Sequence, residues 1–259
     1  MSALDAFRLD GRIALVTGAT GGLGEQAALA LADAGATVII TGRREDRLAS
    51  VAERIRATGA EAHARQLDMT DSGAVRSTFS ELALTAGPID VLVNNAAQAH
   101  QAGVLDVTDA DWARIIDVNL TAVFTASQAF LRLREDGQHG DRPGSIVNIA
   151  SLAATIGVRG QVAYVASKAG VTGLTRALAL DTARAGVRVN ALAPGYFATD
   201  MPSDVLADEA ATAALLKKIP MRRIGKPEEI GPAVVFLASD ASGYMTGAVL
   251  NLDGGYTAQ

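Results

Sequence analysis

The chain has 259 residues with 49% apolar content, enough for one large domain that buries about three quarters of its unfolded surface. The net charge is −5 and charges of both signs are interspersed, which argues against nucleic acid or an anionic membrane as a partner. The absence of cysteine excludes disulfides, thiolate metal sites and a cysteine nucleophile, and His63, His100 and His139 lack metal-ligand spacing, so no metal site is expected.

The first eight residues do not form a signal peptide, because no apolar core follows a positively charged start. No stretch approaches the ~20 consecutive apolar residues of a membrane span. These observations predict a soluble, cytoplasmic protein.

Short β-branched runs alternate with longer Ala- and Leu-rich stretches along the whole chain. The predicted strands are 13–16, 37–41, 62–67, 91–94, 145–149, 187–192 and 248–252. Most are continuously apolar, which is typical of parallel strands covered on both faces. Helices are predicted at 24–34, 44–58, 72–85, 112–134 and 163–185. This pattern predicts an α/β fold, a single-domain Rossmann-type doubly wound parallel sheet of about seven strands with helices on both faces, over residues 1–259.

Two segments interrupt the alternation. Residues 135–144 are polar and Gly/Pro-containing, which predicts a surface loop after a long helix. Residues 196–226 follow a strand end, where open α/β sheets bind ligands, so we expect a small lid over the substrate.

A glycine-rich loop, Thr17-Gly18-Ala19-Thr20-Gly21-Gly22-Leu23-Gly24, separates the first strand from an Ala-rich helix. Glycines at 18, 22 and 24 allow a tight turn, close approach to a pyrophosphate and close helix–strand packing, and the helix N-terminus attracts phosphates. A purely structural turn is the alternative, but the strand–loop–helix context favours a dinucleotide site. No Gly-Lys-Ser/Thr follows, which disfavours ATP chemistry.

The end of the second strand indicates which dinucleotide binds. An acidic residue there would bind the ribose hydroxyls of NAD, whereas this chain has Gly42 followed by Arg43 and Arg44. Guanidinium groups suit a 2′-phosphate, so NADP(H) is favoured, with Arg43 as the contact, and NAD(H) stays open. In the alternative interpretation both arginines only begin a solvated helix, Arg44 more so than Arg43.

Ser151, Tyr164 and Lys168 fall at spacings that can form one proton-transfer site. Tyr164 and Lys168 lie one helical turn apart on the same face, and Ser151 follows a predicted buried strand. A nearby ammonium favours the phenolate of a tyrosine, and a serine hydroxyl can bind the reacting oxygen, which suits an alcohol or carbonyl substrate. Taken alone, a Tyr–Lys pair at this spacing is more often a solvated surface pair.

Together these residues resemble the short-chain dehydrogenase/reductase family, over essentially the whole chain. The resemblance rests on the glycine loop, on Asp68 after the third strand, on Asn94-Asn95-Ala96-Ala97 after the fourth, and on Pro194-Gly195 with Thr199. Asn119, Ser151, Tyr164 and Lys168 match the family's catalytic four. One departure is Ala97 where the family usually has glycine, for which we expect a local backbone adjustment.

The resemblance implies a cofactor site and a mechanism. Lys168 and the oxidised nicotinamide would lower the pKa of Tyr164, which exchanges the proton on the substrate oxygen that Ser151 holds. Asn119 would position a water that leads from Lys168 to solvent; in the alternative it bonds its own helix backbone. The implied cofactor-binding residues are Gly18, Thr20, Gly21, Gly22, Leu23, Gly24, Arg43, Asp68, Met69, Asn95, Ala97, Tyr164, Lys168, Pro194, Gly195, Phe197 and Thr199.

The sequence indicates the substrate less specifically than it indicates the cofactor and the reaction. The candidate pocket residues are Gln98, His100, Leu152, Ala153, Arg159, Gln161, Tyr196 and Phe197. Segments 194–199 and 222–227 look most like gluconate 5-dehydrogenase-like members and related sugar or polyol dehydrogenases. Those relatives carry arginines just after the Asn-Asn-Ala segment, where this chain has Gln98, so a sugar-acid carboxylate would need another partner such as Arg159. A 3-oxoacyl-carrier-protein reductase or broad-specificity ketone reductase stays an alternative, as does a non-catalytic dinucleotide-binding sensor.

The resemblance also implies a homotetramer, since the family uses two long helices and its last strand at two-fold interfaces. Here these would be 112–134, 163–185 and 248–252. His100 is not expected to act as the catalytic base, because Tyr164 already fills that role.

Overall fold

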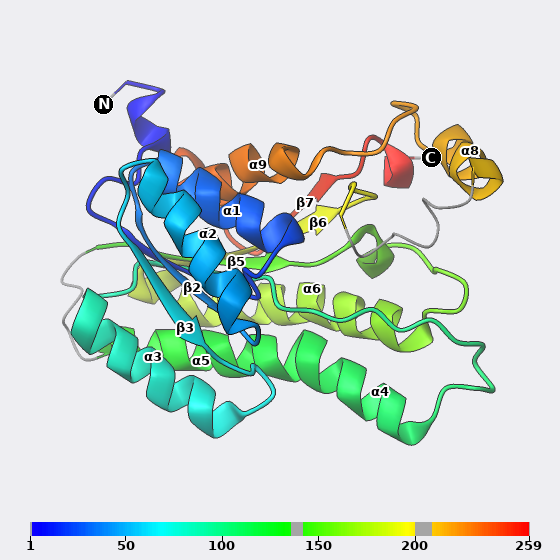
Figure 1. Cartoon of the computed structure of the whole chain (residues 1–259), viewed down its shortest axis with the longest axis horizontal. Coiled ribbons are helices and arrows are strands. Elements are labelled where there is room, and N and C mark those ends of the chain that lie inside the picture. Colours follow the sequence, from blue (N-terminus) through cyan, green and yellow to red (C-terminus); the bar gives the residue numbers. More distant parts are fainter. Residues whose placement is uncertain (1, 136–141, 200–208, 259) are drawn as a thin grey trace.

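The computed structural model describes residues 2–135, 142–199 and 209–258, and its centre is a seven-stranded parallel sheet (Figure 1). The strand order is β3-β2-β1-β4-β5-β6-β7, and every pairing is parallel. The strands are β1 (Ile13–Thr17), β2 (Thr37–Gly42), β3 (Ala62–Gln66), β4 (Val91–Asn94), β5 (Gly144–Ile149), β6 (Val187–Pro194) and β7 (Val249–Leu252). The predicted doubly wound fold is confirmed.

Helices cover both faces of this sheet (Figure 1). One face carries α1 (Gly22–Asp33), α2 (Glu45–Ala57) and α9 (Ile230–Ala238). The other carries α3 (Ser72–Ala86), α4 (Asp109–Ile116), α5 (Ala122–Glu135) and α6 (Val162–Thr182). Helix α8 (Glu209–Lys218) lies beyond the carboxyl ends of the strands.

The continuous apolar character of the strands follows from this layering. Successive side chains of a strand point to opposite faces. Val16 belongs to the buried cluster under α1, α2 and α9, whereas its neighbour Leu15 packs with Phe79 and Phe130 on the opposite face. Both faces are covered, so neither position can be polar without a partner.

The long helix predicted at 112–134 is one helical run with a change of pitch in its middle. It begins earlier, at Asp109, because the hydroxyl of Thr108 accepts a hydrogen bond from the Asp111 N–H (3.1 Å). Between α4 and α5 the backbone makes a π-helical turn, Asp117–Thr121, which contains the predicted site residue Asn119. Single π turns of this kind occur often at functional sites.

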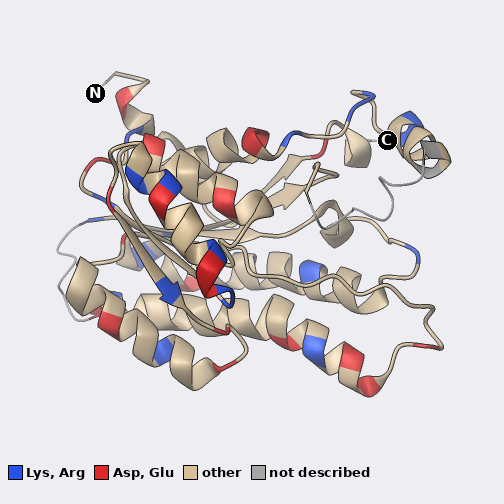
Figure 2. Cartoon of the chain, in the orientation of Figure 1, with Lys and Arg blue, Asp and Glu red and all other residues tan. Residues whose placement is uncertain are grey.

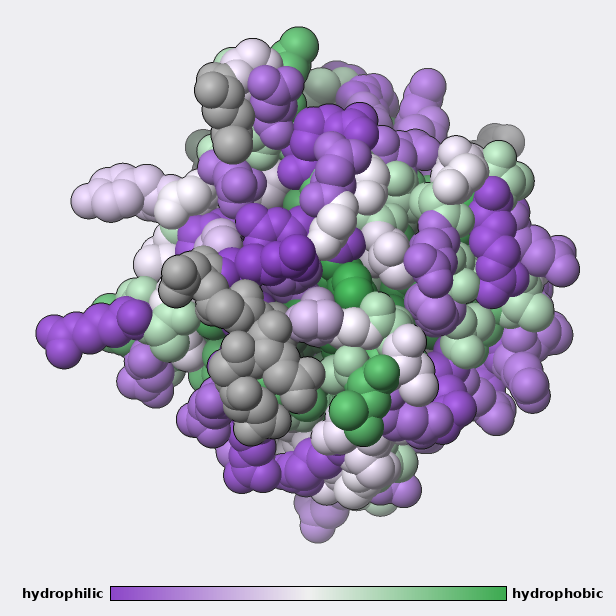
Figure 3. Space-filling view, turned by 90° about the vertical axis from the view of Figure 1, so that its left-hand side faces the viewer, coloured by the Kyte–Doolittle hydropathy of each residue, from purple (hydrophilic) through white to green (hydrophobic). Residues whose placement is uncertain are grey.

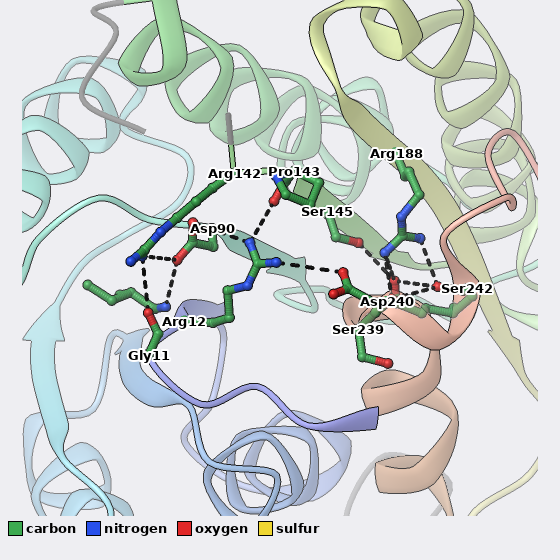
Figure 4. Close-up of polar contacts among 12 residues, drawn as sticks. Gly11, Arg12, Asp90, Arg142, Pro143, Ser145, Arg188, Ser239, Asp240 and Ser242 are labelled. Carbon is green, nitrogen blue, oxygen red and sulfur yellow. Dashed lines mark hydrogen bonds and ion pairs between the residues drawn. The ribbon is translucent and has the colours of Figure 1, made fainter. Parts of the chain in front are cut away.

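At the amino ends of the strands, charged side chains form a group of ion pairs and hydrogen bonds (Figure 4). The buried Asp90 accepts a hydrogen bond from the Ile13 N–H (3.1 Å) and lies 3.8 Å from nitrogens of both Arg12 and Arg142. Figure 3, which shows this end of the molecule, is mostly hydrophilic.

The surface charge pattern agrees with the sequence. Acidic and basic residues are mixed along the exposed helices in Figure 2. Among the helices that the structure describes, none is both long and apolar enough to cross a membrane.

Parts of the two predicted irregular segments fall outside the description. Residues 136–141 of the predicted loop and 200–208 of the predicted lid are not among the described residues. The lid therefore stays a prediction.

Candidate active site

A cavity of about 760 Å³ opens at the carboxyl ends of the central strands. It lies where the strand order reverses between β1 and β4, the point at which open α/β sheets form a ligand crevice. All seventeen residues predicted to bind a cofactor line this cavity, and Ser151 lines it too. Asn119 does not line it and is fully buried nearby.

The glycine loop forms one wall, and its glycines have different tasks. Gly18 has a φ of +66°, and a Cβ there would lie 2.6 Å from the Ala96 Cα. A Cβ on Gly24 would collide with the side-chain amide of Asn95. These two glycines make room for the loop after β4 rather than for a ligand. Gly21, with a φ of +151°, faces open space instead.

Helix α1 begins at Gly22, two residues before its predicted start, and no side chain caps it. The first N–H groups of a helix have no partner within it, and the dipole adds positive potential there. The open N-terminus beside Gly21 is therefore suited to a phosphate.

Asn95 and Thr17 join the loops after β4 and β1. The Asn95 amide donates to the carbonyl oxygens of Thr17 (3.1 Å) and Gly18 (3.0 Å). In return, the Thr17 hydroxyl accepts from the backbone N–H groups of Asn95 (3.0 Å) and Ala96 (3.2 Å). This network fixes the glycine loop against the second half of the sheet. The next residue, Ala97, does not have a positive φ, so its methyl group causes no backbone strain.

The two arginines after β2 are both at the cavity wall. Arg44 donates to the carbonyl (3.2 Å) and hydroxyl (2.9 Å) oxygens of Thr20 in the glycine loop. Arg44 is the exposed residue at the start of α2, as in the alternative interpretation, and it also binds the glycine loop. Gly42 permits this contact, since a Cβ there would lie 2.5 Å from Thr20 Cγ2. Arg43 is exposed, and its charge helps to hold the pKa of Asp68 below the usual value, after the hydrogen bonds from Thr70.

Ser151, Tyr164 and Lys168 converge at the end of β5. Lys168 is buried, and its Nζ donates to the carbonyl oxygen of Ile149 (2.8 Å), the last residue of β5. The same Nζ lies 5.8 Å from the centre of the Tyr164 ring. Ser151 lies two residues after the end of β5, and its hydroxyl accepts from the Ala153 N–H (3.1 Å) while hydrogen bonding with Tyr164. Lys168 is thus buried and Tyr164 is half-buried at the cavity wall, so the two do not form a solvated surface pair.

Burial dominates the ionisation of this pair. It raises the pKa of the Tyr164 phenol, and the hydrogen bond with Ser151 offsets only part of that rise. Burial also lowers the pKa of the Lys168 amine to about 8. The predicted lowering of the Tyr164 pKa involves the oxidised nicotinamide as well as Lys168 and stays a prediction; in the chain without cofactor, desolvation of the phenolate is the larger effect.

The side chain of Asn119 bridges two other elements. Its Oδ1 accepts from the Gln98 N–H (2.8 Å), and its Nδ2 donates to the Gln98 carbonyl (2.9 Å) and to the Ser167 hydroxyl (3.1 Å). The alternative in which Asn119 bonds its own helix backbone is wrong. Its side-chain amide holds protein groups, and the predicted water relay stays a prediction.

The predicted substrate wall is mostly present. Gln98, Leu152, Ala153, Arg159, Gln161, Tyr196 and Phe197 line the cavity. His100 does not, and its Nε2 lies 3.6 Å from an Asp111 carboxylate oxygen. Among the other lining residues, the apolar Leu67, Val118 and Val158 were not singled out by the sequence analysis. Their apolar side chains carry no chemical signal that a sequence would reveal.

Comparison with known proteins decides the family. Residues 18–257 match the family described as enoyl-(acyl carrier protein) reductase, which covers almost the whole fold described above. The chain belongs to the short-chain dehydrogenase/reductase family. As a member of it, the protein is an NAD(P)(H)-dependent oxidoreductase.

Three relatives show the range of activities near this short-chain dehydrogenase/reductase. The galactitol 2-dehydrogenase of Rhizobium johnstonii is 43% identical over 99% of both chains. The 3-oxoacyl-acyl-carrier-protein reductase of Vibrio harveyi is 40% identical over 96% of this chain and 98% of its own. A gluconate 5-dehydrogenase from Burkholderia cenocepacia, solved in complex with NADP and tartrate, superposes over 100% of both chains with a TM-score of 0.94 and 38% identity.

Proposed function

We propose that the enzyme uses NADP(H) to interconvert a secondary alcohol and a ketone on a sugar, sugar acid or polyol. The observation that carries the proposal is the convergence of Ser151, Tyr164 and Lys168 at the end of β5, inside the cavity that the glycine loop also lines. The galactitol and gluconate dehydrogenases among the relatives support the substrate class.

The described residues fit a dinucleotide. The uncapped N-terminus of α1 beside Gly21 suits the pyrophosphate, and Asp68 and Met69, which line the same cavity, would contact the adenine. Arg43 and Arg44 supply positive charge after β2, where a carboxylate would repel a 2′-phosphate. This charge supports a preference for NADP(H) over NAD(H). When bound, the nicotinamide supplies a hydride to the substrate carbon, or accepts one from it.

In ketone reduction, Tyr164 donates its phenolic proton to the carbonyl oxygen. The raised pKa of Tyr164 keeps that proton in place at neutral pH. Ser151 Oγ accepts a backbone N–H and bonds with Tyr164, and when a substrate enters, the hydroxyl can turn its proton to the substrate oxygen. Lys168, as the ammonium, stabilises the phenolate that remains, and in alcohol oxidation the same groups act in reverse.

The polar wall of the cavity supports a hydroxylated substrate. Gln98, Arg159 and Gln161 place amide and guanidinium groups beside the apolar Leu152 and Ala153. Arg159 is exposed and forms no ion pair with any described residue, so its charge is available to a substrate carboxylate. A long acyl chain would gain little from these groups.

The experiment that tests the proposal is a substrate panel followed by the absorbance of the reduced nicotinamide. The panel contains ketohexoses, keto sugar acids, simple ketones and a 3-oxoacyl thioester, each with NADPH and NADH. The proposal expects the highest kcat/KM with NADPH and a hydroxylated ketone. A highest value with the thioester would support the 3-oxoacyl reductase instead, and tight cofactor binding without turnover would support a sensor.

We also propose that the enzyme acts as a homotetramer in the cytoplasm, where NADP(H) is available. Exposed large apolar side chains on the long helices support association: Trp112 on α4, Phe124 on α5 and Leu180 on α6.

A further inference from the structure

Gln98, the first residue after the Asn-Asn-Ala-Ala segment, occupies the cavity wall with an unusual set of partners. Both of its main-chain polar groups are already used, because its N–H and carbonyl bind the Asn119 side chain (2.8 and 2.9 Å). The side-chain amide is therefore the polar group that Gln98 has left for a ligand.

The orientation of that amide is fixed by chemistry. Arg114 Nη1 donates to Gln98 Oε1 (2.8 Å), and a guanidinium has only donors, so the atom that faces Arg114 must be the amide oxygen. The Nε2 group then lies on the other branch of the amide. A rotated amide would place two donors against each other, which is unfavourable.

Arg114 is itself held in place. Its Nη2 donates to Asp111 Oδ1 (2.9 Å), and Thr108 donates its hydroxyl proton to the other oxygen of that carboxylate (2.7 Å). These hydrogen bonds from Thr108 and Arg114 keep the pKa of Asp111 at about 2, so the carboxylate is ionised at any working pH. The Asp111–Arg114 pair thus leaves Nε2 as the side-chain group that Gln98 can offer to a ligand in the cavity that it lines.

Gln98 is also fixed relative to the reacting groups. The Asn119 amide that holds its backbone donates to the Ser167 hydroxyl (3.1 Å), which in turn donates to the Tyr164 carbonyl (2.7 Å). This chain of hydrogen bonds connects the wall residue to the turn of α6 that carries Tyr164. A substrate bound by Gln98 would therefore have a fixed position relative to the Tyr164 phenol.

Within the described part of the chain, Gln98 Nε2 donates to no protein acceptor. We propose that Gln98 is a specificity-determining residue whose Nε2 donates to a substrate oxygen other than the reacting one, and that Arg114 is a positioning residue that enforces this orientation. The inference rests on the proposed function and narrows it. The favoured substrate carries a hydroxyl or carboxylate oxygen near the carbonyl carbon.

The test compares two substrates that differ only in hydroxylation, a 2-ketohexose and 2-hexanone, with NADPH. Gln98→Met removes the donor at similar length, and Gln98→Glu keeps an oxygen for Arg114 but presents no donor. We expect the ratio of kcat/KM for the ketohexose to that for 2-hexanone to fall about tenfold in both variants, the value of one hydrogen bond. A role limited to binding Arg114 would leave this ratio unchanged in Gln98→Glu.

A matched control exists on α5. Gln128 Oε1 also accepts from an arginine, Arg76 Nη2 (3.2 Å), but Gln128 does not line the cavity. Gln128→Met should leave the substrate ratio at the wild-type value. Melting temperature and NADPH titration, measured on every variant, separate a folding defect from a change in specificity.

The role of Arg114 has its own measurement. Arg114→Met should lower the ratio of kcat/KM for the ketohexose to that for 2-hexanone about threefold, because the Gln98 amide can then rotate. Arg114→Lys should keep the ratio near the wild-type value. In the Gln98→Met background, Arg114→Met should cause no further fall in the ratio. A ratio that stays within twofold of wild type in both Gln98 variants overturns the inference while the proposed function stands. A wild-type enzyme that prefers 2-hexanone or a 3-oxoacyl thioester overturns the proposed substrate class and the inference with it.

Discussion

Lys168 is the charged group on which the chemistry of Tyr164 depends. Its amine is buried against β5, which lowers its pKa to about 8, whereas burial raises the pKa of Tyr164. Below about pH 8 the lysine is therefore charged and the tyrosine protonated, which is the combination that ketone reduction requires. Above pH 8 the lysine loses its proton first.

This order of ionisation predicts a pH profile. The kcat/KM for ketone reduction should be level below about pH 8 and should fall about tenfold per pH unit above it, as Lys168 becomes neutral. Lys168→Arg, which keeps its charge, should be slower but should show no break near pH 8. Steady-state rates from pH 6 to 10 check this, and an unchanged break in the arginine variant would assign it to another group.

Arg43 and Arg44 are neighbours with different expected roles. The Arg43 side chain is exposed, and its charge acts on the nearby Asp68 carboxylate. The Arg44 guanidinium instead donates a hydrogen bond to Thr20 of the glycine loop. We expect Arg43→Ala to raise the Kd of NADPH about 10- to 100-fold and to leave that of NADH within about twofold. Arg44→Ala should weaken both cofactors similarly, because it loosens the loop that both share. Fluorescence titration checks this, and equal effects of Arg43→Ala on both cofactors would refute the NADP(H) preference.

At the residue scale, the parts of the site that depend on local sequence spacing could be predicted. The contacts between segments far apart in the sequence could not. Tyr164 and Lys168 are one turn apart, so their meeting follows from helix geometry. The contacts of Asn119 with Gln98 and Ser167, and of Arg44 with Thr20, join segments far apart in the sequence. No periodicity encodes such pairings. The balance of desolvation and charge at Tyr164 likewise depends on packing that only the structure shows.

At the scale of elements, apolar runs in the sequence predicted where the strands lie, and capping residues explain where helices begin. The seven predicted strands correspond to the seven observed, with boundaries that differ by two residues at most. The early start of α1 at Gly22 was not predicted, because Gly22 and Leu23 carry no capping signal. The π-helical turn around Asn119 was also not predicted, and the side chain of Asn119 within it bonds to residues distant in the sequence.

Arg188, near the start of β6, joins this strand to the end of α9, and its substitution tests how much that contact stabilises the fold (Figure 4). Its guanidinium donates to the carbonyl oxygens of Leu237 (3.0 Å) and Ser239 (2.9 Å) at the end of α9, and to the Ser242 hydroxyl (2.8 Å). These bonds neutralise the negative end of the helix dipole and anchor α9 on the sheet. Arg188 does not line the active-site cavity.

We therefore expect Arg188→Met to lower the free energy of unfolding by about 2 kcal/mol, equivalent to about 4–8 °C in Tm, without changing kcat at 25 °C. The exposed Arg47 on α2 provides the control, since Arg47→Met should change Tm by less than about 1 °C. Calorimetry on both variants checks the difference. Equal Tm values would show that the Arg188 bonds are not net stabilising.

At the scale of the whole molecule, the predicted tetramer depends on apolar side chains that the isolated chain leaves in water. Leu180 on α6 is 83% exposed, and Phe124 on α5 is 43% exposed. Light scattering should give the mass of four chains, and Phe124→Glu with Leu180→Glu should reduce it to two or one. A monomeric wild-type protein would contradict the prediction.

The central claim is that Tyr164 transfers a proton to the oxygen of a carbonyl substrate, and Tyr164→Phe tests it most directly. The substitution removes one oxygen from the site and leaves the cavity lining otherwise intact. We predict that kcat for the best ketone of the panel falls about 10³-fold or more, while the Kd for NADPH stays within about threefold of wild type. A variant that retains a substantial fraction of wild-type turnover, with the cofactor bound normally, would contradict the account.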